Sequence, residues 1–189
     1  VVSRQGIGYN NIDVAAATRN GIIVANVPDY CIDEVADHTM ALALCVAREI
    51  KHFGKKMEAG IFVEEPDRPI FRLRGRNFCL YGFGSIARQV ALRAQAFGMQ
   101  THAYDPFVPD ATFDAYGTKR AGDLHRLSAL ADILSIHVPL LDSTRHSITL
   151  DLLRTMKRNC IIVNTARGGI IAENDLIEAL QSGIIAGAG

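Results

Sequence analysis

A glycine-rich turn in the middle of the chain constrains its fold more than any other feature. The apolar run at residues 77–81 stops at Gly82, Gly84 follows, and a helical pattern begins at Ser85. Asp105 stands 21 residues after Gly84, at the end of a second apolar run. A strand, a glycine turn, a helix, a second strand and an acid, in this order, are typical of a dinucleotide-binding βαβ unit.

The residues of this turn have separate physical roles. Gly82 permits the tight turn, and Gly84 lets a pyrophosphate approach the backbone and the N-terminus of the helix expected over 85–97. Ala87 is a tolerated variant, because its position serves close packing of helix against strand. A carboxylate at Asp105 accepts hydrogen bonds from ribose hydroxyls and repels a 2′-phosphate, which favours NAD over NADP. The alternative is an ordinary strand–helix turn followed by an unrelated Asp.

Helices and strands alternate along the chain, and the strand cores are nearly all apolar, which indicates a parallel sheet covered on both faces. We therefore predict a Rossmann-type α/β fold with a doubly wound sheet and right-handed crossovers. The segment between Asp105 and Asp123 is predicted to be a polar loop. Asp123 is predicted to cap the helix that follows. Helices are expected at 14–19, 85–97, 124–130, 149–157 and 173–182, and strands at 22–27, 77–81, 99–104, 132–138, 160–164 and 184–189.

A long helix is expected over residues 33–58. Apolar positions surround most of it, so we expect it to be largely buried. Asp33 is its expected N-cap and Gly60 its stop signal. The polar, proline-bearing segment 61–74 then connects it to the first strand of the sheet.

Composition and charge argue against several classes of protein. Lys plus Arg equals Asp plus Glu at 20 each, which gives no reason to expect a nucleic-acid or anionic-membrane partner. No apolar run reaches the ~18–20 residues that a membrane span needs, and no signal peptide is visible. The four cysteines lack a Cys-x-x-Cys pair, which favours buried reduced thiols of a cytoplasmic protein over disulfides or a metal site. Both ends lie within apolar runs, so we expect a fragment of a longer protein.

Arg167 is the candidate for a catalytic side chain. It follows the strand expected at 160–164, and ligands of parallel sheets lie outside the carboxyl ends of the strands. A guanidinium fork suits the carboxylate and adjacent carbonyl of a small 2-oxo acid. Spacing alone leaves a surface arginine in a turn as the alternative. His137 ends another strand and is expected to be structural, and no histidine here can be nominated as a general acid.

Several segments together resemble one family, the D-isomer-specific 2-hydroxyacid dehydrogenases. The group includes D-3-phosphoglycerate dehydrogenase, glyoxylate/hydroxypyruvate reductase and the C-terminal-binding corepressors. The resemblance runs from end to end, and it departs at Asn10, where the family usually has Asp; we expect a minor effect on that loop. The matching segments are 3–13 (SRQGIGYNNID), 26–28 (NVP), 34–39 (EVADHT), 82–87 (GFGSIA), 104–106 (YDP), 137–140 (HVPL), 144–146 (TRH) and 163–169 (VNTARGG).

The resemblance implies two domains and a homodimer. Residues 1–26 would be the C-terminal part of a flavodoxin-like substrate domain, and 27–189 an NAD-binding domain truncated at its C-terminal end. The helix over 33–58 would cross between the domains and help to form the dimer. No nucleic acid, membrane or metal is implied.

The resemblance also assigns roles to particular residues. Arg167 would be the substrate-orienting catalytic arginine and would also touch the cofactor, while Arg4 and the backbone of Ile7 and Gly8 would hold the substrate carboxylate. The other cofactor-binding residues would be Gly82, Gly84, Ser85 and Ile86 at the pyrophosphate, Asp105 at the ribose, Val138, Pro139 and Thr144 beside the adenine, and Thr39, Thr165 and Ala166 beside the nicotinamide.

The reaction implied is hydride transfer between NAD and C2 of a small D-2-hydroxy acid or 2-oxo acid. The family's general acid is a His whose pKa is raised by a Glu, and both are expected beyond residue 189. We therefore expect these residues alone to be inactive. An NAD-sensing corepressor-like binding protein on the same fold is the alternative.

Overall fold

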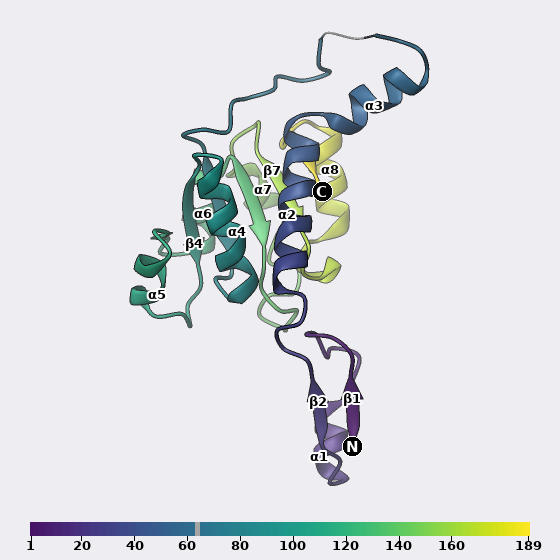
Figure 1. The fold of residues 1–189 in the computed structure, drawn as a ribbon, viewed down its shortest axis with the longest axis vertical. Coiled ribbons are helices and arrows are strands. Elements are labelled where there is room, and N and C mark those ends of the chain that lie inside the picture. The colour runs from purple at the N-terminus through teal and green to yellow at the C-terminus, as the bar shows by residue number, and fades with distance from the viewer. Residues whose placement is uncertain (63–64) are drawn as a thin grey trace.

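The computed structural model describes residues 1–62 and 65–189, which form a large α/β body and a small N-terminal lobe (Figure 1). The body is a six-stranded sheet with the order β5-β4-β3-β6-β7-β8, and every pairing in it is parallel. The lobe is a two-stranded parallel sheet, β1-β2, with one helix. The predicted α/β class with a parallel sheet is confirmed.

The six expected strands are present, although most are shorter than expected, and two strands, β1 and β5, were not expected. The body's strands are β3 (Asn77–Tyr81), β4 (Gln100–Tyr104), β5 (Lys119–Arg120), β6 (Ile133–Ile136), β7 (Ile161–Asn164) and β8 (Gly187–Ala188). Its helices are α2 (Ile32–Ala47), α3 (Ile50–Glu58), α4 (Ser85–Ala96), α5 (Asp110–Ala115), α6 (Leu124–Leu130), α7 (Leu150–Arg154) and α8 (Glu173–Gln181), with a 3₁₀ turn η1 (Gly168–Ile170). The lobe contains β1 (Val2–Arg4), α1 (Val14–Arg19) and β2 (Val24–Asn26).

The sheet separates two hydrophobic cores because successive side chains of a strand point to opposite faces. In β3, Phe78 and Leu80 join the core beneath α2 and α4, whereas Cys79 and Tyr81 join the core beneath α6, α7 and α8. All four side chains are buried. Full burial of a Leu or Phe side chain contributes about 2 kcal/mol. This double cover fixes the carboxyl ends of the strands along one edge of the sheet.

The prediction of a single helix over 33–58 is wrong, because the helix is broken between α2 and α3. Glu49 has a left-handed backbone (φ 53°), and its side chain is buried. One carboxylate oxygen accepts from Arg68 Nε at 2.7 Å and the other from the Asp67 N–H at 2.9 Å. These contacts hold the chain that returns from α3 against the end of α2, and they stabilise the break.

The two halves of this segment also differ in burial. Five residues of α2 are buried, but none of α3 is, so the expected burial is correct only for α2. Asp33 is not the N-cap: Cys31 occupies that position without a side-chain bond, and Asp33 pairs with Arg93 Nη2 at 2.9 Å. The stop at Gly60 is confirmed by its positive φ of 71° just after α3. Residues 63–64 of the expected connection lie outside the described residues.

The segment expected as a loop after Asp105 contains α5 and the edge strand β5. Phe113 of α5 is buried and stacks on Phe83, with ring centroids 4.7 Å apart. Elements this short contain too few residues to show a hydrophobic period. The expected cap is confirmed, since the Asp123 side chain accepts from the Arg126 N–H at 2.7 Å.

Burial of the cysteines is confirmed for two of the four. Cys79 and Cys160 are buried, whereas Cys31 and Cys45 are half-buried, and all four are free thiols. Burial raises the pKa of the Cys160 thiol to about 12 and that of Cys79 further still, so both stay protonated. In the part of the chain that the structure describes, we find no helix of the length and hydrophobicity that a membrane crossing requires.

Candidate functional site

The glycine turn between β3 and α4 has the geometry that its sequence predicts. Gly82 has a φ of +91°, and a Cβ at this position would lie 2.9 Å from the backbone of His137. Any other residue would therefore be strained and would clash with the neighbouring strand end. A Cβ on Gly84 would meet nothing within 4 Å, so the turn faces open space at that point.

The N-terminus of α4 is available to an anion. Gly84 is its N-cap and provides no side-chain bond, and the first turn contains no acidic residue. The free N–H groups of the first turn, with the positive end of the helix dipole, are suited to a phosphate group. Ser85 is the first residue of this turn, and its hydroxyl accepts from Arg88 Nη2 at 3.1 Å.

Asp105 lies against the same turn. Its two carboxylate oxygens accept hydrogen bonds from the backbone N–H groups of Phe83 and Phe107, each at 2.9 Å. These bonds orient the carboxylate and brace the glycine turn. Each oxygen keeps further lone pairs, so Asp105 can still accept from ligand hydroxyls.

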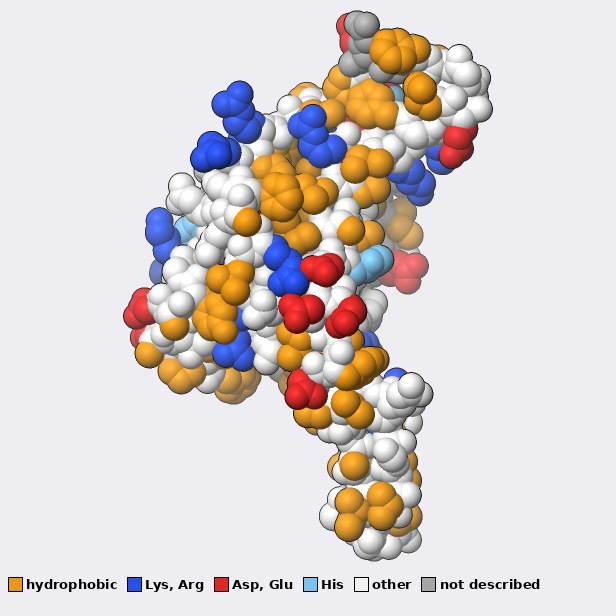
Figure 2. All heavy atoms as spheres, viewed as in Figure 1, with side chains coloured by type: hydrophobic (Ala, Val, Ile, Leu, Met, Phe, Trp, Pro, Cys, Tyr) orange, Lys and Arg blue, Asp and Glu red, His pale blue; other side chains and the backbone are white. Residues whose placement is uncertain are grey.

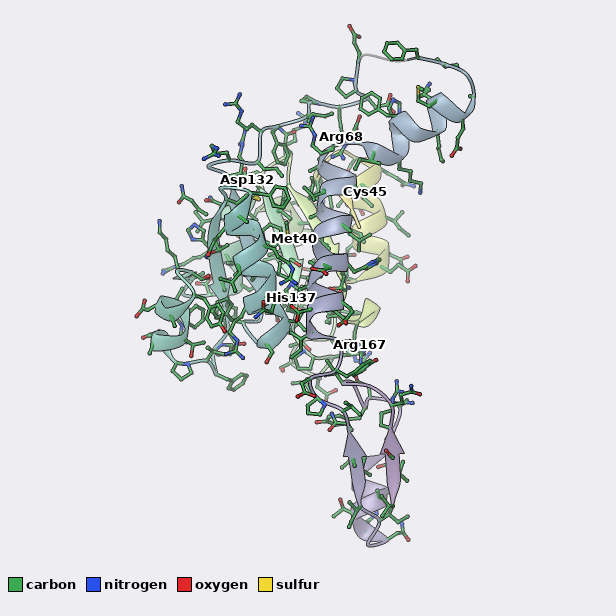
Figure 3. All side chains as sticks on the ribbon, in the orientation of Figure 1. Met40, Cys45, Arg68, Asp132, His137 and Arg167 are labelled. Atoms are coloured by element: carbon green, nitrogen blue, oxygen red, sulfur yellow. The ribbon has the colours of Figure 1, made fainter. Side chains whose placement is uncertain are left out.

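A cleft of about 530 Å³ opens between the N-terminal lobe and the carboxyl ends of β6 and β7. Figure 3 shows Arg167 at this junction, with His137 on the side of the sheet. Nine of the residues proposed from the sequence line the cleft: Arg4, Ile7, Gly8, Ile86, Val138, Pro139, Thr165, Ala166 and Arg167. The structure thus brings together segments that are far apart in the sequence.

The other six lie around the cleft and do not line it. Gly82, Gly84 and Ser85 belong to the turn described above, and Asp105 lies against it. Thr39 is buried in α2, and its hydroxyl lies 2.9 Å from that of Thr165. The Thr144 hydroxyl donates to the Pro139 carbonyl at 2.6 Å and accepts from the Leu141 N–H at 2.8 Å, so it shapes the loop after β6.

Some cleft residues were not nominated from the sequence. Tyr30, Cys31 and Val35 approach from the start of α2, and Asn10 and Tyr9 from the lobe. Only the fold brings the start of α2 to the carboxyl edge of the sheet, and no motif marks Tyr30 or Cys31. For Asn10, the expected difference from the family resemblance is the only signal in the sequence.

Arg167 extends from the turn after β7 toward the lobe. Its Nε donates to Asn10 Oδ1 at 3.1 Å, and its Nη1 donates to the Ala166 carbonyl at 2.8 Å. A Cβ on Gly8 would lie 1.6 Å from Arg167 Nη2, so only glycine allows the loop to pass this close. No ion pair of Arg167 is found within residues 1–62 and 65–189.

The charge of the cleft is positive. Arg4 and Arg167 both line it, and no Asp or Glu is among its described lining residues. The Nε of Arg4 is buried and has no hydrogen-bond partner in the described part of the chain. Two guanidinium groups without an acidic neighbour favour an anionic ligand, and a carboxylate matches their planar donor geometry.

His137 has the structural character expected of it. Its Nε2 lies 2.8 Å from the Ser135 hydroxyl at the end of β6. Burial lowers the pKa of His137 to about 4, so the ring is neutral near pH 7. A neutral imidazole that hydrogen-bonds a hydroxyl is poorly suited to supply a proton to a carbonyl.

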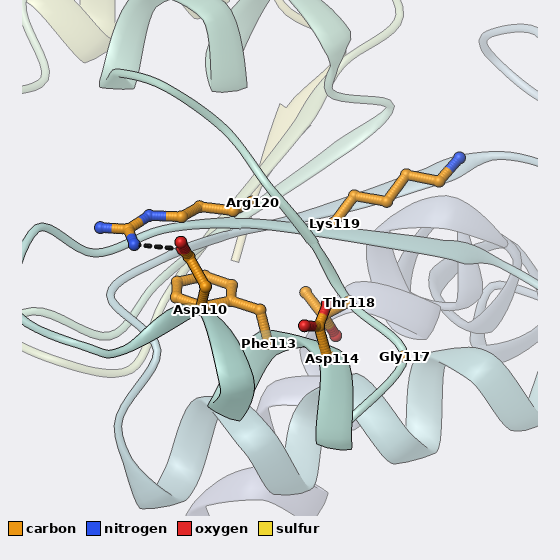
Figure 4. Close-up of a pocket in the computed structure, with 7 residues that line it drawn as sticks. All are labelled: Asp110, Phe113, Asp114, Gly117, Thr118, Lys119 and Arg120. Carbon is orange, nitrogen blue, oxygen red and sulfur yellow. Dashed lines mark hydrogen bonds and ion pairs between the residues drawn. The ribbon is translucent and has the colours of Figure 1, made fainter.

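A second hollow of about 430 Å³ lies between α5 and β5 (Figure 4). Its Arg120 is paired with Asp110, with Nη1 and Oδ1 2.5 Å apart, and Asp114 adds a further negative charge. The mixed charges do not favour one class of ligand. Across residues 1–62 and 65–189, no three His, Cys, Asp or Glu side chains gather in a way that could hold a metal ion.

Comparison with known proteins gives a consistent result. Residues 40–189 match the family described as "D-isomer specific 2-hydroxyacid dehydrogenase, NAD binding domain". The whole chain is 43% identical to D-3-phosphoglycerate dehydrogenase of Methanocaldococcus jannaschii and covers 36% of that protein. It is 41% identical to hydroxypyruvate reductase of Thermotoga maritima and covers 60% of it.

A solved structure agrees with these relatives. The D-lactate dehydrogenase of Aquifex aeolicus, complexed with NAD and lactic acid, superposes with a TM-score of 0.91 at 27% identity; the match covers 100% of this chain and 57% of that one. The chain thus spans between about a third and three fifths of the length of the proteins that it matches here. Motif, sheet order and sequence similarity agree: the chain belongs to the D-isomer-specific 2-hydroxyacid dehydrogenase family and contains its NAD-binding domain.

Proposed function

We propose that the whole protein is an NAD-dependent D-2-hydroxyacid dehydrogenase, acting on one of the small 2-hydroxy or 2-oxo acids that are the substrates of this family. The observation that carries this proposal is the positive cleft beside the nucleotide turn, with Arg167 free of any described acidic partner. Bound NAD supplies the hydride acceptor or donor. The residues of the chain bind and orient the two reactants.

The roles proposed for the cofactor residues come from the family resemblance, and the open glycine turn supports those at the pyrophosphate. The open N-terminus of α4, with Gly84, Ser85 and Ile86, would hold the pyrophosphate. Asp105 would accept from the ribose hydroxyls, and its charge would exclude a 2′-phosphate, which favours NAD over NADP. The loop after β6, with Val138, Pro139 and Thr144, would flank the adenine. Thr39, Thr165 and Ala166 would lie beside the nicotinamide.

The substrate residues lie on both sides of the cleft. The backbone N–H groups of Ile7 and Gly8, with Arg4, would bind the substrate carboxylate. Arg167 would orient the carboxylate and polarise the adjacent carbonyl as charge develops on its oxygen. His137 is neutral at working pH and is not the proton donor in this proposal. We assign that role to a His outside these residues, paired with a Glu that raises its pKa.

We further propose that residues 1–26 belong to a flavodoxin-like substrate domain and 27–189 to the NAD-binding domain. The separate two-stranded sheet of the lobe supports this division. The family match begins at residue 40, within α2, and is compatible with a boundary slightly before it. A cytoplasmic location stays a prediction.

A homodimer formed through α3 is part of the proposal. We call α3 and the residues just after it, 50–62, the arm. No residue of α3 is buried, and the arm has four exposed large apolar side chains: Ile50, Met57, Ile61 and Phe62. Figure 2 shows hydrophobic side chains gathered at this end of the molecule. Sedimentation of the whole protein tests the dimer, and substitution of Met57 and Phe62 by Ser should shift it to monomer.

The test of function is turnover by the full-length protein. NADH oxidation should be followed with glyoxylate, hydroxypyruvate and other small 2-oxo acids, beside a titration of NADH binding without acid. We expect NADH-dependent reduction of at least one acid. Tight NADH binding without turnover on any acid would contradict the enzyme proposal and favour the corepressor-like sensor.

A further inference from the structure

Asn10 lies in the glycine-rich loop of the N-terminal lobe, and its side chain reaches the body of the molecule twice. Its Oδ1 accepts from Arg167 Nε at 3.1 Å, and its Nδ2 donates to the Leu140 carbonyl at 3.3 Å. These partners are 157 and 130 positions away along the chain. One side chain of the lobe therefore connects the turn after β7 to the loop after β6.

The chemistry of these two partners suits an amide. A guanidinium only donates hydrogen bonds, and a carbonyl only accepts them. The side chain between Arg167 and Leu140 must therefore accept at one end and donate at the other, which also fixes the orientation of the Asn10 amide. An ionised Asp at this position would accept from Arg167 but would place an oxygen against the Leu140 carbonyl.

Asn10 is uncharged, and this affects how Arg167 can act on a ligand. Asn10 orients the guanidinium of Arg167 and adds no negative charge. With Nε held by Asn10 and Nη1 by the Ala166 carbonyl, the Nη2 edge remains, and it lies against Gly8. The charge of Arg167 is thus directed toward the loop proposed to bind the substrate carboxylate.

We propose that Asn10 is a positioning residue for Arg167, which makes the orientation of the arginine depend on the approach of the N-terminal lobe. This inference rests on the proposed role of Arg167 in binding and polarising a 2-oxo acid. The residue at position 10 then affects the site as well as its loop.

The test uses the full-length protein with Asn10→Ala and Asn10→Asp. Asn11→Ala is the matched control, because this neighbouring amide is exposed and makes no side-chain hydrogen bond in the described part of the chain. The readouts are kcat and KM for the best 2-oxo acid, the Kd of oxalate for the NADH complex, and the Kd of NADH. Thermal melting reports whether each variant is folded.

Both substitutions at position 10 should raise KM and the oxalate Kd by about tenfold, because a hydrogen bond to a charged group is lost or its charge is neutralised. The fall in kcat should be smaller, and the Kd of NADH and the melting temperature should not change. Asn11→Ala should match the wild type. A variant that merely loses its fold would bind both NADH and oxalate more weakly. The proposed positioning role predicts weaker binding of oxalate alone.

The inference is overturned if both folded Asn10 variants keep KM and oxalate Kd within about twofold of the wild type. Arg167→Ala separates that failure from a failure of the proposed function. If Arg167→Ala is nearly inactive while the Asn10 variants are normal, only the positioning role is wrong. If Arg167→Ala is itself fully active, the proposed function of the arginine fails first.

Discussion

The α/β body and the N-terminal lobe differ sharply in how they are stabilised. The body has two cores that cover both faces of its sheet, and side chains such as Phe78 and Leu80 are completely buried. In the lobe, Ala17 is the single hydrophobic side chain that is buried, while Val1 and Ile23 are 89% and 66% exposed. The body therefore specifies its own structure, whereas the lobe has little core of its own and contributes a loop to the cleft.

The largest effect should come from the core of the body. Phe78→Ala removes a fully buried ring between β3 and the helices above it, and should lower the free energy of unfolding by about 3–5 kcal/mol. Ile23→Ala in the lobe is the matched change at an exposed position and should cost less than about 0.5 kcal/mol. Urea unfolding of the whole protein measures both. A cost at Ile23 close to that at Phe78 would show that this face of the lobe is covered in the whole protein.

The body and the lobe each place one arginine in the cleft, Arg167 and Arg4, and the two are expected to differ in their effect on catalysis. Arg167→Ala removes the group that would stabilise charge on the reacting oxygen, so kcat/KM should fall by about 10²–10³. Arg4→Ala, on the lobe, should raise KM by about tenfold with a smaller effect on kcat, because it would contact only the carboxylate. Steady-state kinetics with a 2-oxo acid distinguish the two effects. Equal losses in kcat would mean that the lobe takes part in the chemical step.

The half-buried imidazole of His137 in the body predicts a pH dependence of stability. Burial lowers the pKa of His137 from 6.5 to about 4, so between these values the unfolded chain binds more protons than the folded one. Stability from this group is complete above pH 6.5 and is lost as the pH falls toward 4. The loss should be about 1–3 kcal/mol, discounted because the ring keeps some solvent contact. Unfolding of His137→Gln should show a smaller fall over this window, and an identical profile would contradict the argument.

The smallest expected effect is on the binding of the NADH ribose by Asp105. Asp105→Ala should raise the Kd of NADH by about tenfold through loss of hydrogen bonds to a charged acceptor, and should improve binding of NADPH relative to NADH. Glu58→Ala, on the exposed arm, is a suitable control. Calorimetry with each cofactor measures the ratio. If NADPH remains as weak as before relative to NADH, the exclusion of the 2′-phosphate does not depend on this carboxylate.

The sequence predicted most of the fold of the body because its signals are local. The glycines at 82 and 84, the apolar runs that became β3, β6 and β7, and the cap at Asp123 each act within a few residues. The break at Glu49 could not be predicted, since it depends on Arg68, which is 19 positions away in a separate segment. Similarly, α5 and β5 depend on packing of Phe113 against Phe83 and have no period of their own.

The candidate site was predictable only in part, for the same reason. The turn, Asp105 and Arg167 follow strand ends, and the carboxyl edge of a parallel sheet is a known place for ligands. Tyr30 and Cys31 join the cleft because α2 starts beside it, which no motif indicates. The pairing of Asn10 with Arg167 joins the lobe to the body across 157 positions of the chain, and no local pattern indicates a contact at that separation.

The central claim is that hydride passes between the nicotinamide and C2 of a small acid held in the positive cleft. The most direct measurement uses NADH deuterated at C4 on the transferred face, with the full-length protein and its best 2-oxo acid. We predict a D-2-hydroxy acid that contains one deuterium at C2, formed in step with NAD⁺, and loss of this product in Arg167→Ala. A protein that binds NADH but leaves every acid unlabelled at C2 would contradict the claim.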